Sequence, residues 1–75
     1  MLIPDNIHPK NTVYYNGAIV LEAIPEEGGI EMLLLYEEAN VSQSITMPLF
    51  VLCLDWLFLL DLIEMDSYGR VSRCT

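Results

Sequence analysis

Positive charge is scarce in this sequence. Only Lys10, Arg70 and Arg73 oppose eleven Asp and Glu residues, which gives a net charge of −8. Proteins that bind DNA obtain most of their affinity from Lys and Arg side chains that neutralise phosphates. This balance argues against an independent nucleic-acid binder, although an acidic chain can still associate with a basic partner protein.

Side chains that carry catalysis or bind metals are equally scarce. The single histidine, His8, lies in a proline-rich segment, where it is a poor candidate for a Ser/His/Asp triad. Cys53 and Cys74 are isolated, without a CxxC motif, so we expect two free thiols in a reducing cytosol and no zinc site. The GxxxxGK[ST] motif that holds ATP is also missing. We therefore predict a protein that is not an enzyme and uses no cofactor or metal.

No apolar segment is long enough to cross a membrane. The most apolar stretch covers residues 49–60, contains Asp55 and stops at Asp61, whereas a membrane span needs about 20 apolar residues. The first ten residues, MLIPDNIHPK, lack the order of basic residues, apolar run and cleavage site of a signal peptide. We therefore expect a cytoplasmic protein outside the membrane.

Apolar residues are nevertheless abundant for so short a chain. They make up 53% of its 75 residues, above the ~45–50% that is usual even when glycine is counted. A chain of this length forms one domain and buries only roughly 60–65% of the surface that it exposes when unfolded. The excess predicts that part of the apolar surface is covered by a partner protein or by a second copy of the chain.

The residue pattern predicts a single domain over 1–75 that starts with an extended lead-in, 1–11. The lead-in contains two prolines and two asparagines, and Leu2 and Ile3 could form a short edge strand in it. Four segments follow: helices at about 12–24, 30–39 and 46–60, and a β-hairpin over 62–73.

Three helices followed by a hairpin are the element order of a winged helix-turn-helix. We therefore assign the α+β class and a small winged-helix-like fold. Asn11 or Thr12 can cap the first helix. At the end of the third helix a glycine is usual, because the backbone often becomes left-handed there. Asp61 stands at this position and tolerates that conformation better than most residues do.

The third helix carries apolar residues on two sides. If it packs as in other winged helices, one side faces the core and is continued by the first residues of the hairpin. The predicted core residues are Phe50, Cys53, Leu54, Leu57, Leu62 and Ile63.

The second apolar side of this helix predicts a protein interface. Leu52, Trp56 and Leu59 follow at i, i+4 and i+7, with Asp55 and Phe58 beside them. A helix that reads the major groove of DNA presents polar side chains instead, and Trp is enriched at binding hot spots. We expect this stripe to face outward and to bind a partner protein, with Asp55 meeting a partner's Arg or Lys or simply reaching water. A homodimer that covers both sides is the alternative.

Arg70 and Arg73 flank the predicted wing of the hairpin. Inside a larger complex they could add one or two phosphate contacts. The alternative is that they only keep the hairpin solvated.

Two segments, LIPD at 2–5 and LCLDWLFLLDLIE at 52–64, resemble the small middle component of ABC-three-component systems, the Lamassu-type bacterial defence operons. The resemblance covers most of the chain. It implies a small subunit joined to an SMC- or Rad50-like coiled-coil ATPase, with an effector, often a nuclease, as the third component. Such complexes sense foreign DNA from phage or plasmid. The resemblance therefore implies a non-catalytic accessory subunit that couples the ATPase to the effector and meets DNA only through the complex.

Two other functions stay open on the residues alone. An acidic inhibitor that mimics DNA would suit the charge, but six of the eleven acidic residues lie within 22–38, which permits only a local acidic patch. A free-standing winged-helix regulator would require tight DNA binding by the isolated chain.

Overall fold

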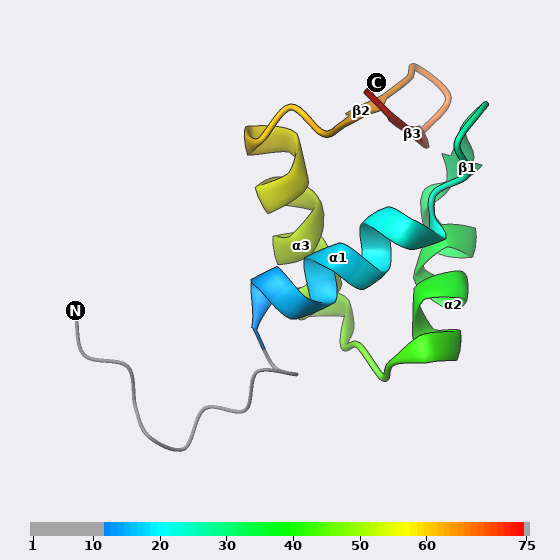
Figure 1. The fold of residues 1–75 in the computed structure, drawn as a ribbon. Coiled ribbons are helices and arrows are strands. Elements are labelled where there is room, and N and C mark those ends of the chain that lie inside the picture. Colours follow the sequence, from blue (N-terminus) through cyan, green and yellow to red (C-terminus); the bar gives the residue numbers. More distant parts are fainter. Residues whose placement is uncertain (1–11, 75) are drawn as a thin grey trace.

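The computed structural model describes residues 12–74, which contain three helices and a three-stranded sheet (Figure 1). The predicted α+β class, with three helices and a C-terminal hairpin, is confirmed, and the winged-helix assignment itself stays a prediction. The lead-in 1–11, with its expected strand at Leu2 and Ile3, lies outside the described residues. In chain order the elements are α1 (Val13–Ala23), β1 (Ile30–Glu31), α2 (Met32–Ser42), α3 (Met47–Leu59), β2 (Ile63–Met65) and β3 (Arg70–Arg73).

Threonine side chains cap the N-termini of two of the helices. The hydroxyl oxygen of Thr12 accepts a hydrogen bond from the backbone N–H of Tyr15 at 3.1 Å, so Thr12 is the cap of α1. Thr46 does the same for α3 and accepts from the backbone N–H of Leu49 at 3.4 Å, with Pro48 in the first turn. Each hydroxyl satisfies a backbone donor that has no partner within the helix.

The second helix begins later than predicted, because the residues at its expected start form a strand. Ile30 pairs with Val71 and Glu31 pairs with Arg70 in an antiparallel arrangement, which gives a sheet of order β1-β3-β2. Gly29 allows this approach, since a Cβ atom there would lie 3.0 Å from the Cβ of Arg70. The pairing satisfies backbone groups that a helix start would leave without intrahelical partners.

The second helix also ends later than predicted and extends into the segment expected to be a polar connector. Asn40 lies near this end, where its amide donates to the carbonyl of Tyr36 at 2.8 Å and its side-chain oxygen accepts from the N–H of Ile45 at 2.9 Å. The Tyr36 hydroxyl donates to the carbonyl of Ile45 at 2.8 Å. These bonds hold the loop between α2 and α3 against the end of α2, and they place Ile45 in the core.

The end of α3 forms the left-handed turn that the sequence predicts. Asp61 has φ 58°, which is the only positive φ of a non-glycine residue among residues 12–74. The N–H of Asp61 donates to the carbonyl of Phe58, and the N–H of Leu62 donates to the carbonyl of Leu57, both at 3.0 Å. This is the hydrogen-bond pattern of a Schellman motif.

Asp61→Gly should therefore stabilise the domain. An L-residue in the left-handed region costs roughly 1–2 kcal/mol relative to the right-handed helix, and Gly avoids that cost while losing some chain entropy on folding. We expect a net gain of about 0.5–1 kcal/mol in the free energy of unfolding. Pulse proteolysis in urea of the full chain, fused to a stable carrier protein, measures this. Asp61→Ala is the control, since it removes the carboxylate but keeps a Cβ atom and should not stabilise.

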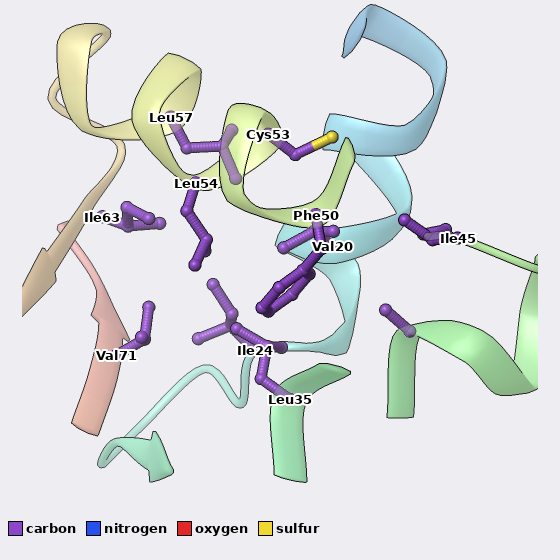
Figure 2. Packing of buried hydrophobic residues seen from close by; sticks show 11 residues of the cluster. Val20, Ile24, Leu35, Ile45, Phe50, Cys53, Leu54, Leu57, Ile63 and Val71 are labelled. Atoms are coloured by element: carbon purple, nitrogen blue, oxygen red, sulfur yellow. The ribbon is translucent and has the colours of Figure 1, made fainter. Parts of the chain in front are cut away.

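The core lies where α1 packs against both α2 and α3, with the sheet closing one end (Figures 1 and 2). Four predicted core residues of α3 are confirmed, and so is Ile63. Leu62 was predicted to be buried and is exposed, because neighbouring residues in an extended chain point to opposite sides and Ile63 takes the inward one. The buried cluster consists of Val20, Ile24, Leu35, Ala39, Ile45, Phe50, Cys53, Leu54, Leu57, Ile63 and Val71.

Candidate protein-interaction site

The side of α3 that points away from the core is apolar. Leu52 and Leu59 lie on it with 54% and 81% of their surface exposed, and Val51 is exposed as well. Asp55 lies among them and is the acidic residue of this helix. We call Val51, Leu52, Asp55 and Leu59 the outer α3 face. It contains three of the residues that the sequence analysis placed at an interface.

Trp56 and Phe58 are half-buried rather than fully outward-facing. The Trp56 ring meets the ring of Tyr14 edge-on, with centroids 5.1 Å apart and planes at 72°. Gly17 on α1 leaves room for the indole, since a Cβ atom there would lie 3.6 Å from Trp56 Cδ1. Trp56 therefore joins α1 to α3 at the edge of the outer α3 face.

Tyr14 extends this apolar surface onto α1 and was not identified from the sequence. It is 73% exposed, and its ring packs edge-on against the ring of Trp56. The sequence carries one signal, a glycine three residues after Tyr14 on the same side of the helix. That glycine indicates a close neighbour on α1, but the neighbour is identified only once α1 is placed across α3.

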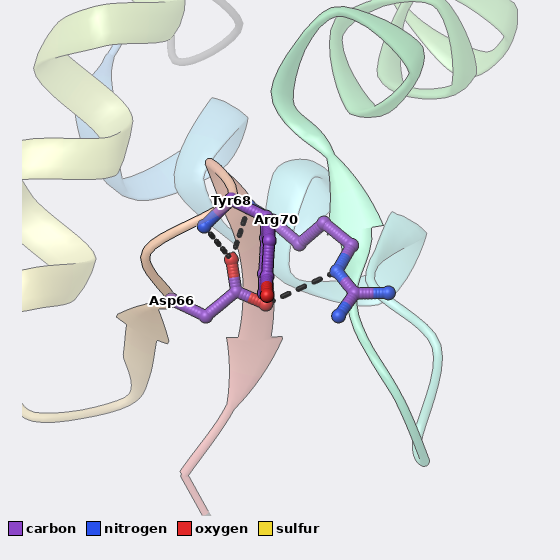
Figure 3. Close-up of polar contacts among 3 residues, drawn as sticks. All are labelled: Asp66, Tyr68 and Arg70. Atoms are coloured by element: carbon purple, nitrogen blue, oxygen red, sulfur yellow. Dashed lines mark hydrogen bonds and ion pairs between the residues drawn. The ribbon is translucent and has the colours of Figure 1, made fainter.

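The two arginines of the hairpin both make contacts within the domain. Arg70 Nε donates to the carboxylate of Asp66 at 3.0 Å, and its guanidinium lies 5.7 Å from the centroid of the Tyr68 ring (Figure 3). Arg73 Nε donates to the carbonyl of Ile24 at 2.9 Å, just past the end of α1. A phosphate contact by either arginine stays a prediction, and for Arg73 it competes with this bond to the backbone.

Asp66 organises the turn of the hairpin. Its carboxylate accepts from the backbone N–H groups of Arg70 and Tyr68 at 2.9 and 2.8 Å, as well as from the Arg70 side chain (Figure 3). The backbone hydrogen bond from Arg70 is the main cause that lowers the pKa of Asp66 below its usual value. Because the folded-state pKa is lowered, the carboxylate stabilises the hairpin above its unfolded-state pKa.

Asp66→Ala should lower the urea midpoint of unfolding at pH 7, because the turn loses its acceptor. The difference from wild type should shrink as pH falls from about 4 through the lower folded-state pKa, where the wild-type carboxylate is protonated. Pulse proteolysis in urea between pH 7 and pH 3 measures this. The control is Glu27→Ala, an exposed residue of the α1–β1 turn. An Asp66→Ala effect that stays constant with pH would contradict this role of the charge.

Few groups in residues 12–74 are arranged for chemistry. No cluster of three His, Cys, Asp or Glu side chains in this part of the chain could hold a metal ion. Burial raises the pKa of the Cys53 thiol, which disfavours the reactive thiolate. An open depression lined by Glu31, Tyr68 and Arg70 lies beside the hairpin. Among residues 12–74, the outer α3 face is therefore the surface best suited to bind another protein.

By length and composition, none of the helices in residues 12–74 is sufficient alone to cross a membrane. Together, Met32–Ser42 and Met47–Leu59 have the length and composition of a broken span, with a bend of 107° between them.

The chain is similar to a known protein family. The family model described as ABC-three component (ABC-3C) system Middle Component 6 matches residues 3–74, nearly the whole chain. No curated protein and no solved structure matches the chain.

Proposed function

Because the chain belongs to the Middle Component 6 family of ABC-three component systems, we propose that it is a non-catalytic accessory subunit whose outer α3 face docks on an SMC- or Rad50-like ATPase. In this role it couples the ATPase to a nuclease effector and meets DNA only through the assembled complex. Membership in a family of middle components supports an accessory role beside other subunits.

The exposure of the outer α3 face is the observation that carries this proposal. The inner side of α3 already fills the core with Phe50, Cys53, Leu54 and Leu57, so the fold does not need apolar residues on the other side. Leu52 and Leu59 instead leave apolar surface in water, which costs about 25 cal/mol for each Å² that a partner could cover. Contiguous exposed apolar surface of this kind marks protein interfaces.

The composition of this face also indicates what binds it. A helix that reads base edges presents Arg, Lys, Asn or Gln side chains, and none of these lies on the outer α3 face. Asp55 is the polar group within it. The partner surface should therefore be apolar and should carry one Arg or Lys opposite Asp55.

Co-expression tests the proposal. Expressed alone, the chain should form oligomers or aggregates, because its outer α3 face stays uncovered. Co-expressed with an SMC- or Rad50-like ATPase of the same system, the chain should co-purify in a defined complex. A monodisperse monomer that does not bind the ATPase would contradict the proposal. A stable dimer that ignores the ATPase would assign the face to self-association instead.

A further inference from the structure

A second exposed apolar face lies on α2, away from α3. Leu34, Glu37, Glu38 and Val41 follow at i, i+3, i+4 and i+7 and point away from the core, to which α2 contributes Leu35 and Ala39 on its other side. Leu34 is 47% exposed and Val41 is 82% exposed. We call Leu34, Glu37, Glu38 and Val41 the outer α2 face. In Figure 1, α1 crosses between α2 and α3, and both helices contact α1.

The two glutamates make this face chemically different from the outer α3 face. Within residues 12–74 the cationic side chains are Arg70 and Arg73, of which Arg70 pairs with Asp66 and Arg73 bonds to the carbonyl oxygens of Ile24 and Glu22. Neither arginine pairs with Glu37 or Glu38, whose carboxylates are exposed on either side of the line from Leu34 to Val41.

The charge selects among the partners that could cover such a face. A second copy of the chain carries a net charge of −8 and would place carboxylates against carboxylates. The anionic surface of a bacterial or cytoplasmic lipid leaflet would likewise repel it. A helix with apolar residues on one side and Lys or Arg at its flanks complements both the leucine and valine side chains and the two glutamates.

We propose that the outer α2 face binds an amphipathic, basic helix of another protein. From Leu34 to Val41 the face extends over seven residues, about 10 Å along the axis, which matches two turns of a partner helix. The apolar side chains provide the contact area, and the flanking Lys or Arg residues pair with Glu37 and Glu38. The partner helix would contact this face through apolar residues of its own at i, i+3, i+4 and i+7, as amphipathic helices do when they bind to other proteins. The assignment is independent of whether the outer α3 face docks on an ATPase.

A synthetic peptide pair tests the proposal. One peptide is a helix with leucines along one side and lysines at both flanks, and the other has the same composition with the leucines distributed around the helix. Fluorescence anisotropy measures the binding of each to the full chain fused to a carrier protein. We expect the one-sided peptide to bind ~10-fold more tightly than the scrambled one.

Matched variants of the chain locate the binding. Leu34→Ser with Val41→Ser should weaken binding of the one-sided peptide ~10-fold. Glu37→Gln with Glu38→Gln should weaken it at low salt and leave it unchanged at about 1 M salt, where charges are screened beyond ~3 Å. Glu26→Gln with Glu27→Gln makes the same change of charge in the α1–β1 turn and should have no effect.

Four results would overturn the proposal. Equal binding of the two peptides would show attraction by charge alone. The same conclusion would follow if the Glu26→Gln, Glu27→Gln control lost as much binding as the Glu37→Gln, Glu38→Gln variant. A loss of binding in Leu52→Ser with Leu59→Ser would place the peptide on α3. Sedimentation in which Leu34→Ser with Val41→Ser converts an oligomer into a monomer would assign the outer α2 face to self-association.

Discussion

Leu57→Ala should leave the chain without a stable fold. Leu57 is 3% exposed and lies in the core with Cys53, Leu54 and Ile63 (Figure 2). Truncating a buried leucine removes transfer free energy and leaves a cavity, at a cost of about 2–5 kcal/mol. A domain of this size has a total stability near the lower end of ~5–15 kcal/mol. The loss therefore takes most of the free energy of unfolding.

Pulse proteolysis of the fused chain measures this effect. The Leu57→Ala protein should be cleaved at little or no urea, whereas the wild type should resist. Val51→Ala is the matched control, because Val51 lies on the same helix with its side chain exposed. It should change the free energy of unfolding by less than ~0.5 kcal/mol, as surface substitutions usually do. Equal effects at both positions would show that the two sides of α3 are wrongly assigned.

Leu52→Ala with Leu59→Ala should have the opposite outcome and lose the partner while keeping the fold. Both side chains are exposed, and Ala favours a helix at least as well as Leu does. If the outer α3 face is the centre of an interface, we expect a loss of at least ~2 kcal/mol of binding free energy. The dissociation constant for the ATPase should therefore rise roughly thirtyfold.

The measurement is quantitative co-purification with the ATPase subunit, followed by pulse proteolysis of the variant. Leu33→Ala is the control, since Leu33 is a leucine of comparable exposure on α2. Leu33→Ala should bind the ATPase as the wild type does. Normal binding of the double variant would contradict the docking on α3. Trp56→Ala is a less clear test, because Trp56 also packs against Tyr14 and Gly17, so its truncation changes both the fold and the surface.

Much of the fold follows from local patterns in the sequence. The helical spacing of Phe50, Cys53, Leu54 and Leu57 identifies the inner side of α3, and the structure buries all four. Asp61 occupies the left-handed turn because a short polar side chain tolerates that conformation better than most others. Features of this kind depend on residues near in sequence, so they can be predicted without knowledge of the tertiary structure.

The predictions that failed concern the two ends of the second helix. Ile30 fits the spacing of the second helix, yet it forms a strand because Val71, some forty residues later, supplies a partner. The segment after Asn40 looks like a connector with capping residues, but Asn40 bonds to Tyr36 and Ile45 and keeps α2 helical to Ser42. The pairing of Ile30 with Val71 is not visible in a window of neighbouring residues, whereas the bonds of Asn40 span only four and five residues and were missed because its side chain looked like a cap.

The candidate site was partly predictable for the same reason. Exposed Leu52 and Leu59 follow from the helical period once the inner side is known. The half-burial of Trp56 does not, because it requires the crossing of α1 over α3 at Gly17. The glutamates of α2 could be recognised as exposed from sequence. That Leu34 and Val41 beside them are also exposed follows only from the packing of α2, which turns Leu35 and Ala39 into the core.

Site-specific photo-crosslinking tests the central claim most directly. A photoreactive amino acid is introduced at position 59, where the side chain is 81% exposed on α3, and in a separate protein at position 27 in the α1–β1 turn. Each is irradiated in the complete three-component complex, and the adducts are identified by mass. Docking through the outer α3 face predicts a covalent adduct with the ATPase from position 59 and none from position 27. An ATPase adduct from position 27 alone, or a dimer of the chain from position 59, would contradict it.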